Sequence, residues 1–240
     1  MINDQLIAHR GWQRRYPENT LLGIEQALLV GAKHIEIDVQ LTADYVPVLC
    51  HDQTLERIAS SPLNINQCRF DQLVALSAYE PERLGDQFLG TPFSTLSECL
   101  TLLADFKDAT LYIEVKCESL STFGPTAVFD AIYVLIQSSN VQCFVISFDI
   151  EILELFKQHQ WSQVVPVLSS WKQAFAERVQ VLNPPLIFCD TKLIPKGRSP
   201  FDFPFPSAFY EVDDIEQARA LLSQGASLIE TFAIAEMMVT

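Results

Sequence analysis

The chain has 240 residues, of which 49% are hydrophobic, and it carries a formal net charge of −14 at neutral pH. This length and apolar content are enough for one sizeable core, arranged as two small domains or as one α/β barrel. The acidic balance argues against nucleic acid or an anionic membrane as the main partner, because binding to either needs clustered lysines and arginines.

Three polar pieces near the N-terminus each follow a short apolar run. They are HRG at residues 9–11, EID at 36–38 and HD at 51–52. Short apolar runs with β-branched residues predict buried strands. The sequence therefore predicts that histidines, an arginine and acids lie at or near strand ends.

The apolar spacing and the turn residues predict alternating strands and helices along the whole chain. In chain order, these are a strand ending by residue 11, a helix over 21–28, strands over 34–41 and 46–51, helices near 70–76 and 96–106, a strand over 111–116, a helix over 125–138, a strand over 141–148, a helix over 151–159, a strand over 164–168, a helix near 171–178, strands over 186–190 and 208–212, a helix over 215–224 and a strand over 228–232.

Residues 54–90 interrupt this alternation. Prolines and glycines divide the segment, and only the stretch around 70–76 has helical spacing. We interpret it as a small insertion folded over the site, within a single domain that spans residues 1–240.

Short strands alternating with helices predict parallel pairing through right-handed crossovers. With the 46–51 strand taken as a hairpin extension of 34–41, eight strands are left, which is the number in a closed TIM (β/α)₈ barrel. An open doubly wound sheet is the alternative, but no glycine-rich GxGxxG or P-loop motif supports it.

Alternation along the strands groups the charged residues. Glu36 and Asp38 share one face of their strand, and Glu114 and Lys116 share one face of another, because side chains at i and i+2 point the same way. Buried carboxylates are costly unless they are paired or bound to a cation. Three acids, two histidines and two cations suit a hard divalent metal and an anionic substrate; they are Glu36, Asp38, Glu114, His9, His51, Arg10 and Lys116.

Five motifs in order resemble the glycerophosphodiester phosphodiesterase family. They are HRG at 9–11, PENT at 17–20, GAKHIEIDVQLT at 31–42, VLCHD at 48–52 and IEVK at 113–116. The segments at 54–57, 91–100 and 145–149 extend the resemblance, which is strong up to about residue 149.

The resemblance implies a TIM barrel with a small insertion after the HD strand. It implies metal-dependent hydrolysis of a small glycerophosphodiester to sn-glycerol 3-phosphate and an alcohol. The positions matching the family's metal ligands, for Mg²⁺ or Ca²⁺, are Glu36, Asp38 and Glu114. His9 and His51 match the acid/base pair, with His9 favoured as the acid although the sequence allows the reverse. Arg10 and Lys116 match the residues on the phosphate.

The C-terminal strands depart from the family pattern. Residues 210–213 read YEVD where the family usually has WTVN, and 230–232 read ETF where it usually has TD. The missing tryptophan removes an apolar wall beside the alcohol, and the missing aspartate removes a support at the barrel rim. Tyr210 is a candidate substrate-binding residue, although a core position is as consistent with the pattern.

These departures leave two other functions open. One is a phospholipase-D-like barrel that acts on lysolipids or sphingolipids. The other is a barrel that binds a phosphorylated ligand without turning it over, although the intact set of acids and histidines argues against it.

The remaining composition predicts a cytoplasmic location. The six cysteines are widely spaced with no Cys-x-x-Cys pair, which is typical of reduced core cysteines and not of a disulfide or zinc framework. The first residues lead directly into the first strand, which predicts no signal peptide. No apolar run approaches the roughly 20 residues of a membrane span, so no integral membrane segment is expected.

Overall fold

The computed structural model describes residues 2–238, in which eight parallel strands surround a central axis. They are β1 (Leu6–His9), β2 (His34–Leu41), β4 (Thr110–Val115), β5 (Gln142–Ser147), β6 (Val164–Leu168), β7 (Ile187–Asp190), β8 (Ser207–Tyr210) and β9 (Leu228–Thr231). Neighbours pair in chain order, and β1 pairs with both β2 and β9, so the sheet is closed. The predicted TIM (β/α)₈ barrel is confirmed.

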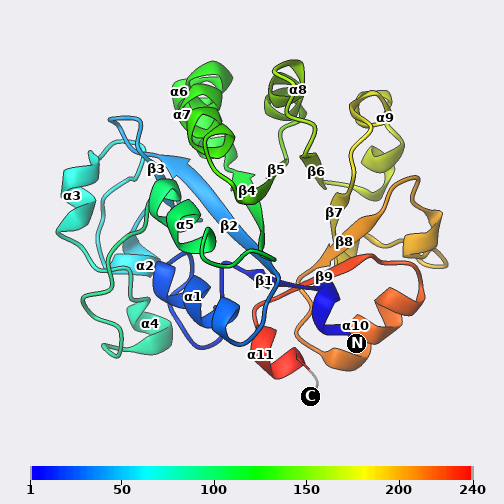
Figure 1. Cartoon of the computed structure of the whole chain (residues 1–240), viewed down its shortest axis with the longest axis horizontal. Coiled ribbons are helices and arrows are strands. Elements are labelled where there is room, and N and C mark those ends of the chain that lie inside the picture. The colour runs from blue at the N-terminus through cyan, green and yellow to red at the C-terminus, as the bar shows by residue number, and fades with distance from the viewer. Residues whose placement is uncertain (1, 239–240) are drawn as a thin grey trace.

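Helices cover the outside of the barrel (Figure 1). They are α1 (Leu21–Leu29), α5 (Leu96–Leu103), α6 (Cys117–Phe123), α7 (Pro125–Gln137), α8 (Ile150–Gln158), α9 (Glu177–Leu182), α10 (Ile215–Ser223) and α11 (Ile234–Met237), with 3₁₀ helices η1 (Ile2–Gln5), η2 (Trp171–Phe175), η3 (Thr191–Leu193) and η4 (Pro200–Asp202).

Strand alternation divides the apolar residues into two layers. Outward side chains such as Ile35, Ile37 and Val39 pack under the helices in the main core. Inward side chains such as Val167 and Phe188 fill the barrel itself. The interior is therefore packed, and polar side chains are displaced to the barrel ends.

The segment after β2 forms a separate layer on one side of the barrel. It contains β3 (Pro47–Leu49), which pairs antiparallel with β2, and helices α2 (Glu56–Ala59), α3 (Phe70–Val74) and α4 (Pro81–Leu84). These helices lie together beside α1 and α5 (Figure 1). Apolar side chains from β3, α2, α3 and the connecting loops form a small separate core.

Several predicted elements differ from the structure. The segment 54–90 has three short helices where one was predicted, because α2 and α4 are single turns too short to show apolar periodicity. Helix α6 was not predicted. The helix predicted near 171–178 is a 3₁₀ helix followed by α9, because Ala176 is extended between them.

None of the described helices is by itself long and apolar enough to cross a membrane. The pair α6 and α7 meets the length and composition criteria only together, across a bend of 118°. All six cysteines are free, and five are buried.

Candidate active site

A cavity of about 140 Å³ lies among side chains that follow or end the strands β1, β4, β5, β8 and β9. Its polar lining comes from His9, Arg10, His51, Glu114, Lys116, Tyr210, Glu211 and Glu230. These positions are at the C-terminal ends of strands, where TIM barrels carry their chemistry. The structure thus gathers predicted site residues from segments more than 100 positions apart.

Three carboxylates meet beside the cavity. Asp38 of β2 pairs in register with Glu114 of β4, and Glu36 lies two residues before Asp38 on the same face. One oxygen from each lies within 4.8 Å of the others. Glu36 Oε1 is buried and has no hydrogen-bond partner among residues 2–238. The alternation predicted from the sequence therefore produces a compact set of oxygen donors.

Asp38 is the most tightly held of these acids. Asn19 donates from Nδ2 to Asp38 Oδ2 at 2.9 Å and accepts the Asp38 backbone N–H at 3.0 Å. Arg10 Nε lies 3.0 Å from Oδ2, and Lys116 Nζ lies 3.2 Å from Oδ1. Burial opposes ionisation, but these two cations outweigh it and lower the pKa of Asp38. Asp38 is therefore a fixed negative charge.

Glu36 and Glu114 behave differently. Burial, followed by the charge of Asp38, raises the pKa of both groups. Lys116 donates to Glu114 at 2.8 Å, which offsets part of this effect. In the absence of a cation, the two groups resist ionisation beside Asp38.

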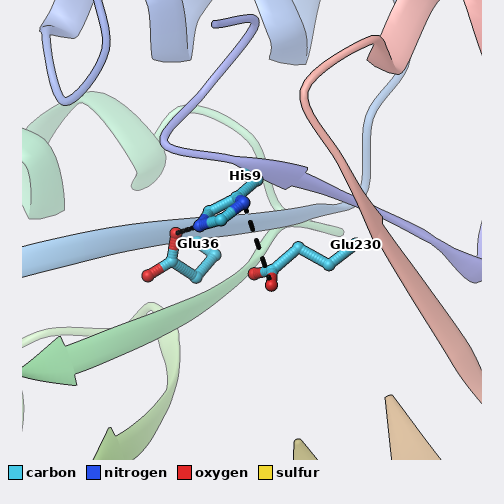
Figure 2. A group of neighbouring side chains, drawn as sticks. All are labelled: His9, Glu36 and Glu230. Carbon is cyan, nitrogen blue, oxygen red and sulfur yellow. Dashed lines mark ion pairs between the residues drawn. The ribbon is translucent and has the colours of Figure 1, made fainter. Parts of the chain in front are cut away.

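His9 at the end of β1 lies between two acids (Figure 2). Its Nε2 is 3.7 Å from Glu36 Oε2, and its Nδ1 is 4.0 Å from Glu230 Oε2. The ring stacks on Phe232, with centroids 4.4 Å apart and planes 8° apart. Burial, followed by the charge of Arg10, lowers the pKa of His9.

Glu230 was not among the predicted site residues. The signal available was a single charged residue in the short strand β9 (LIET), because buried parallel strands are usually apolar on both faces. It is 3% exposed, and burial raises its pKa well above the usual value.

His51 lies beyond β3 and lines the opposite part of the polar rim. Its Nδ1 is 2.7 Å from Asp52 Oδ1. The hydrogen bonds from His51 and Arg57 lower the pKa of Asp52 against the effect of burial. Arg57 of α2 donates from Nε to Asp52 at 2.7 Å, so the insertion holds the pair in place.

Arg57 also contacts one acid outside the insertion and one within it. It donates to Glu18 from two nitrogens, at 2.7 and 3.1 Å, and to Glu80 at 3.4 Å. Glu80 accepts the Glu18 backbone N–H at 2.8 Å, and Glu18 contacts Arg10 at 3.1 Å. We call Glu18, Asp52, Arg57 and Glu80 the insertion network. None of the four was among the predicted site residues.

The altered C-terminal strands form a different wall from the one expected. Tyr210 is half-buried and lines the cavity beside apolar residues of β5 to β7. At the rim, Asp213 accepts the Thr231 hydroxyl at 2.8 Å and the Phe232 N–H at 3.0 Å. A carboxylate therefore does support the last strand, but it comes from the preceding loop.

The sequence matches a family model and several named relatives. The description of the matching family model is "Glycerophosphoryl diester phosphodiesterase family", and the match covers residues 9–184. Glycerophosphodiester phosphodiesterase 1 of Mus musculus is 36% identical over 110 residues, which are 46% of this chain and 33% of that protein. A glycerophosphodiester phosphodiesterase of Caldanaerobacter subterraneus subsp. tengcongensis is 36% identical over 111 residues, 46% of this chain and 44% of that protein. The matches thus span less than half of each relative.

Solved structures share the fold over nearly the whole chain. A phosphodiesterase of Oleispira antarctica in complex with the product sn-glycerol-3-phosphate superposes with a TM-score of 0.86 at 24% identity, covering 97% of this chain and 94% of that one. A putative glycerophosphoryl diester phosphodiesterase of Silicibacter pomeroyi gives 0.77 at 20% identity, covering 97% and 91%. The family match includes the HRG, EID, HD and IEVK motifs that meet at the cavity, and the chain belongs to the glycerophosphoryl diester phosphodiesterase family.

Proposed function

We propose that the chain is a metal-dependent phosphodiesterase that hydrolyses glycerophosphodiesters to sn-glycerol 3-phosphate and an alcohol, with His9 and His51 as its acid/base pair. The observation that carries the proposal is the meeting of Glu36, Asp38 and Glu114 beside a cavity that both histidines line. The complex of the Oleispira antarctica phosphodiesterase with sn-glycerol-3-phosphate supports the same product.

The carboxylates fit a hard divalent cation. Glu36, Asp38 and Glu114 offer only oxygen donors, which is the set that Mg²⁺ and Ca²⁺ prefer. The unpartnered oxygen of Glu36 and its raised pKa are the expected signs of a group that a cation would relieve. When bound, the ion supplies Lewis-acid stabilisation of the phosphoryl oxygens.

Arg10 and Lys116 would bind the phosphate. Both side chains line the cavity and are largely buried, and their neighbouring carboxylates raise the pKa of each against the effect of burial. They therefore carry permanent positive charge on an otherwise acidic protein. Arg10 also presents several N–H donors in a fork that matches a phosphate.

The two histidines would move the protons. His51 is held by Asp52 through Nδ1, which leaves Nε2 to take a proton from the attacking water or substrate hydroxyl. His9 then gives a proton to the leaving alkoxide. The apolar residues on the far side of the cavity, including Tyr210, would contact the glycerol or alcohol group.

Substrate hydrolysis tests the proposal directly. Glycerophosphocholine, glycerophosphoglycerol and a lysophospholipid are incubated with EDTA, Mg²⁺, Ca²⁺ or Mn²⁺, and products are followed by ³¹P NMR. We expect hydrolysis of a glycerophosphodiester with a metal and none with EDTA. Cleavage that EDTA leaves unchanged would refute the metal's role, and faster cleavage of the lysophospholipid would shift the substrate to lysolipids.

Substitution of the histidines gives the second test. His51→Ala should lower kcat by about 10²–10⁴-fold, because one proton transfer loses its catalyst. His159→Ala is the matched control, because His159 is exposed at the end of α8 on the outside of the barrel. Near-normal turnover by His51→Ala would remove His51 from the mechanism.

A further inference from the structure

A buried carboxylate on the floor of the cavity has no evident structural purpose. Glu230 projects from β9 next to the apolar side chains that fill the barrel, and it is 3% exposed. Its Oε1 has no hydrogen-bond partner in the part of the chain that the structure describes. Burying a carboxylate without a partner is destabilising. An apolar residue at this position would extend the packed interior, so the glutamate is retained at a cost to stability.

The carboxylate faces one atom of the proposed machinery. His9 Nδ1 lies 4.0 Å from Glu230 Oε2 and, like Glu230 Oε1, it is buried without a hydrogen-bond partner within residues 2–238. The other ring nitrogen, Nε2, faces Glu36 (Figure 2). Stacking on Phe232 fixes the plane of the ring, so the two nitrogens point in set directions. Nδ1 of the ring therefore faces Glu230, and Nε2 faces Glu36, one of the three proposed metal-binding carboxylates.

At His51, the corresponding pair of an imidazole Nδ1 and a carboxylate is already at hydrogen-bond distance. Its Nδ1 lies 2.7 Å from Asp52, which leaves Nε2 as the free nitrogen. A carboxylate on one imidazole nitrogen selects the tautomer and orients the ring for work at the other nitrogen.

We propose that Glu230 is the positioning residue of His9, accepting a hydrogen bond from Nδ1–H in the metal-loaded protein and thereby directing Nε2 at the reacting phosphodiester. When His9 acts as the acid it carries a second proton on Nε2, gives that proton to the leaving alkoxide and keeps the one on Nδ1. The catalytic consequence rests on the proposed function, whereas the pairing requires only that the site binds a cation. The two atoms must approach by about 1 Å to reach hydrogen-bond distance. Catalytic hydrogen bonds that are long without substrate commonly tighten when the site is filled.

The competing explanation is a second metal ion. One atom each of His9, Glu36 and Glu230 lies within 4.8 Å of the others, which would allow an ion. The geometry of the ring favours the pairing. Glu36 and Glu230 approach different nitrogens of His9, Nε2 at 3.7 Å and Nδ1 at 4.0 Å. An ion held by all three residues would use a single nitrogen of the ring.

Histidine NMR tests the pairing without reference to activity. The chain has four histidines, so two-bond ¹H–¹⁵N spectra of ¹⁵N-histidine-labelled protein resolve each ring, with His9→Gln identifying the signal. In the Ca²⁺-loaded wild type, the neutral form of His9 should carry its proton on Nδ1. In Glu230→Leu that preference should be lost, with both tautomers or the Nε2–H form present. An unchanged His9 spectrum in Glu230→Leu would overturn the proposal.

Calorimetric titration with Ca²⁺ separates pairing from metal ligation. Wild type and Glu230→Gln should each bind one ion with similar affinity. Two ions in the wild type and one in the variant would make Glu230 a ligand, and the positioning role would be wrong.

Kinetics and stability complete the test. Glu230→Leu should lower kcat by about 10–100-fold, the usual effect of losing a carboxylate behind a working histidine, with KM nearly unchanged. Its melting temperature should equal or exceed that of the wild type, because a buried charge is replaced by an apolar side chain.

The exposed Glu25→Gln on α1 is the control. Unchanged kcat would refute the role of Glu230, whereas a wild type that cleaves no diester would refute the proposed function and leave the NMR test valid.

Discussion

Arg57 connects acids from three separate parts of the chain. Its guanidinium contacts Asp52, Glu18 and Glu80, and through Glu18 it borders Arg10. Its donors form a rigid fork that a lysine cannot reproduce. The predicted site residues came from local motifs, in which spacing within one strand carries the signal. The insertion network was invisible to that reasoning because its members become neighbours only when residues 54–90 fold against the barrel.

Replacing Arg57 should destabilise the protein. Arg57→Met leaves Glu18, whose side chain is 1% exposed, with Arg10 as its remaining cation. Because Arg57 itself is 38% exposed, we expect a loss of about 2 kcal/mol, less than for a fully buried pair. Urea denaturation measures it.

The control for Arg57→Met is Arg178→Met, which breaks an exposed pair with Glu154 of similar geometry. It should cost under about 1 kcal/mol. Equal losses for the two variants would show that burial of Glu18 contributes nothing.

At the scale of elements, the turn between β1 and α1 determines how closely that helix approaches the site. Gly11 has φ +82°, and a Cβ at this position would lie 2.7 Å from the carbonyl carbon of Gly23. Thr20 caps α1 by accepting the Gly23 N–H at 3.2 Å. The glycine of the HRG motif is therefore required for packing, a role separate from the chemistry of its two neighbours.

Gly11→Ala should destabilise the protein by at least about 2 kcal/mol, since strain at positive φ adds to backbone overlap that cannot relax. Gly31→Ala is the matched control, because Gly31 has φ +101° but no atom within 4 Å of its Cβ position. It should cost only the backbone strain, about 1 kcal/mol. Thermal unfolding of the two variants would contradict this account if Gly31→Ala were the less stable one.

Predictability of the elements depended on whether an apolar pattern marked them. Strand β2 was predicted over its observed eight residues because its alternation is long and regular. Single-turn helices α2 and α4 carry too few residues for any period to appear. Near residues 171–178 a helix was predicted, but the break at Ala176 was not. In the site, the carboxylates Glu36, Asp38 and Glu114 were predicted as a group and do lie together, whereas Glu230 was missed because its neighbour His9 lies across the β1–β9 junction.

For the whole molecule, metal affinity should couple stability to pH. A glutamate with a raised folded-state pKa keeps its proton when the unfolded chain has lost it. Glu36 and Glu114 therefore destabilise the metal-free fold increasingly as pH rises from the reference value of 4.5 through their folded-state pKa values. A divalent ion bound to the ionised forms, as proposed, would remove this penalty.

We therefore expect Ca²⁺ to raise the melting temperature more at pH 8 than at pH 5, as measured by differential scanning fluorimetry. Glu36→Gln should abolish most of the increase. A shift that is independent of pH would indicate that the ion binds elsewhere.

The insertion network also limits how this barrel can diversify. A segment that only covered the cavity could be exchanged between relatives without other changes. Such an exchange would alter substrate preference and leave the catalytic residues of the barrel as they are. Here Arg57 and Glu80 belong to that segment, whereas Glu18 belongs to the loop after β1. Arg57 donates to the Glu18 carboxylate, and the Glu18 backbone N–H donates to Glu80. A chimera made by swapping residues 54–90 should therefore fold properly only when Glu18 and its two partners are inherited together.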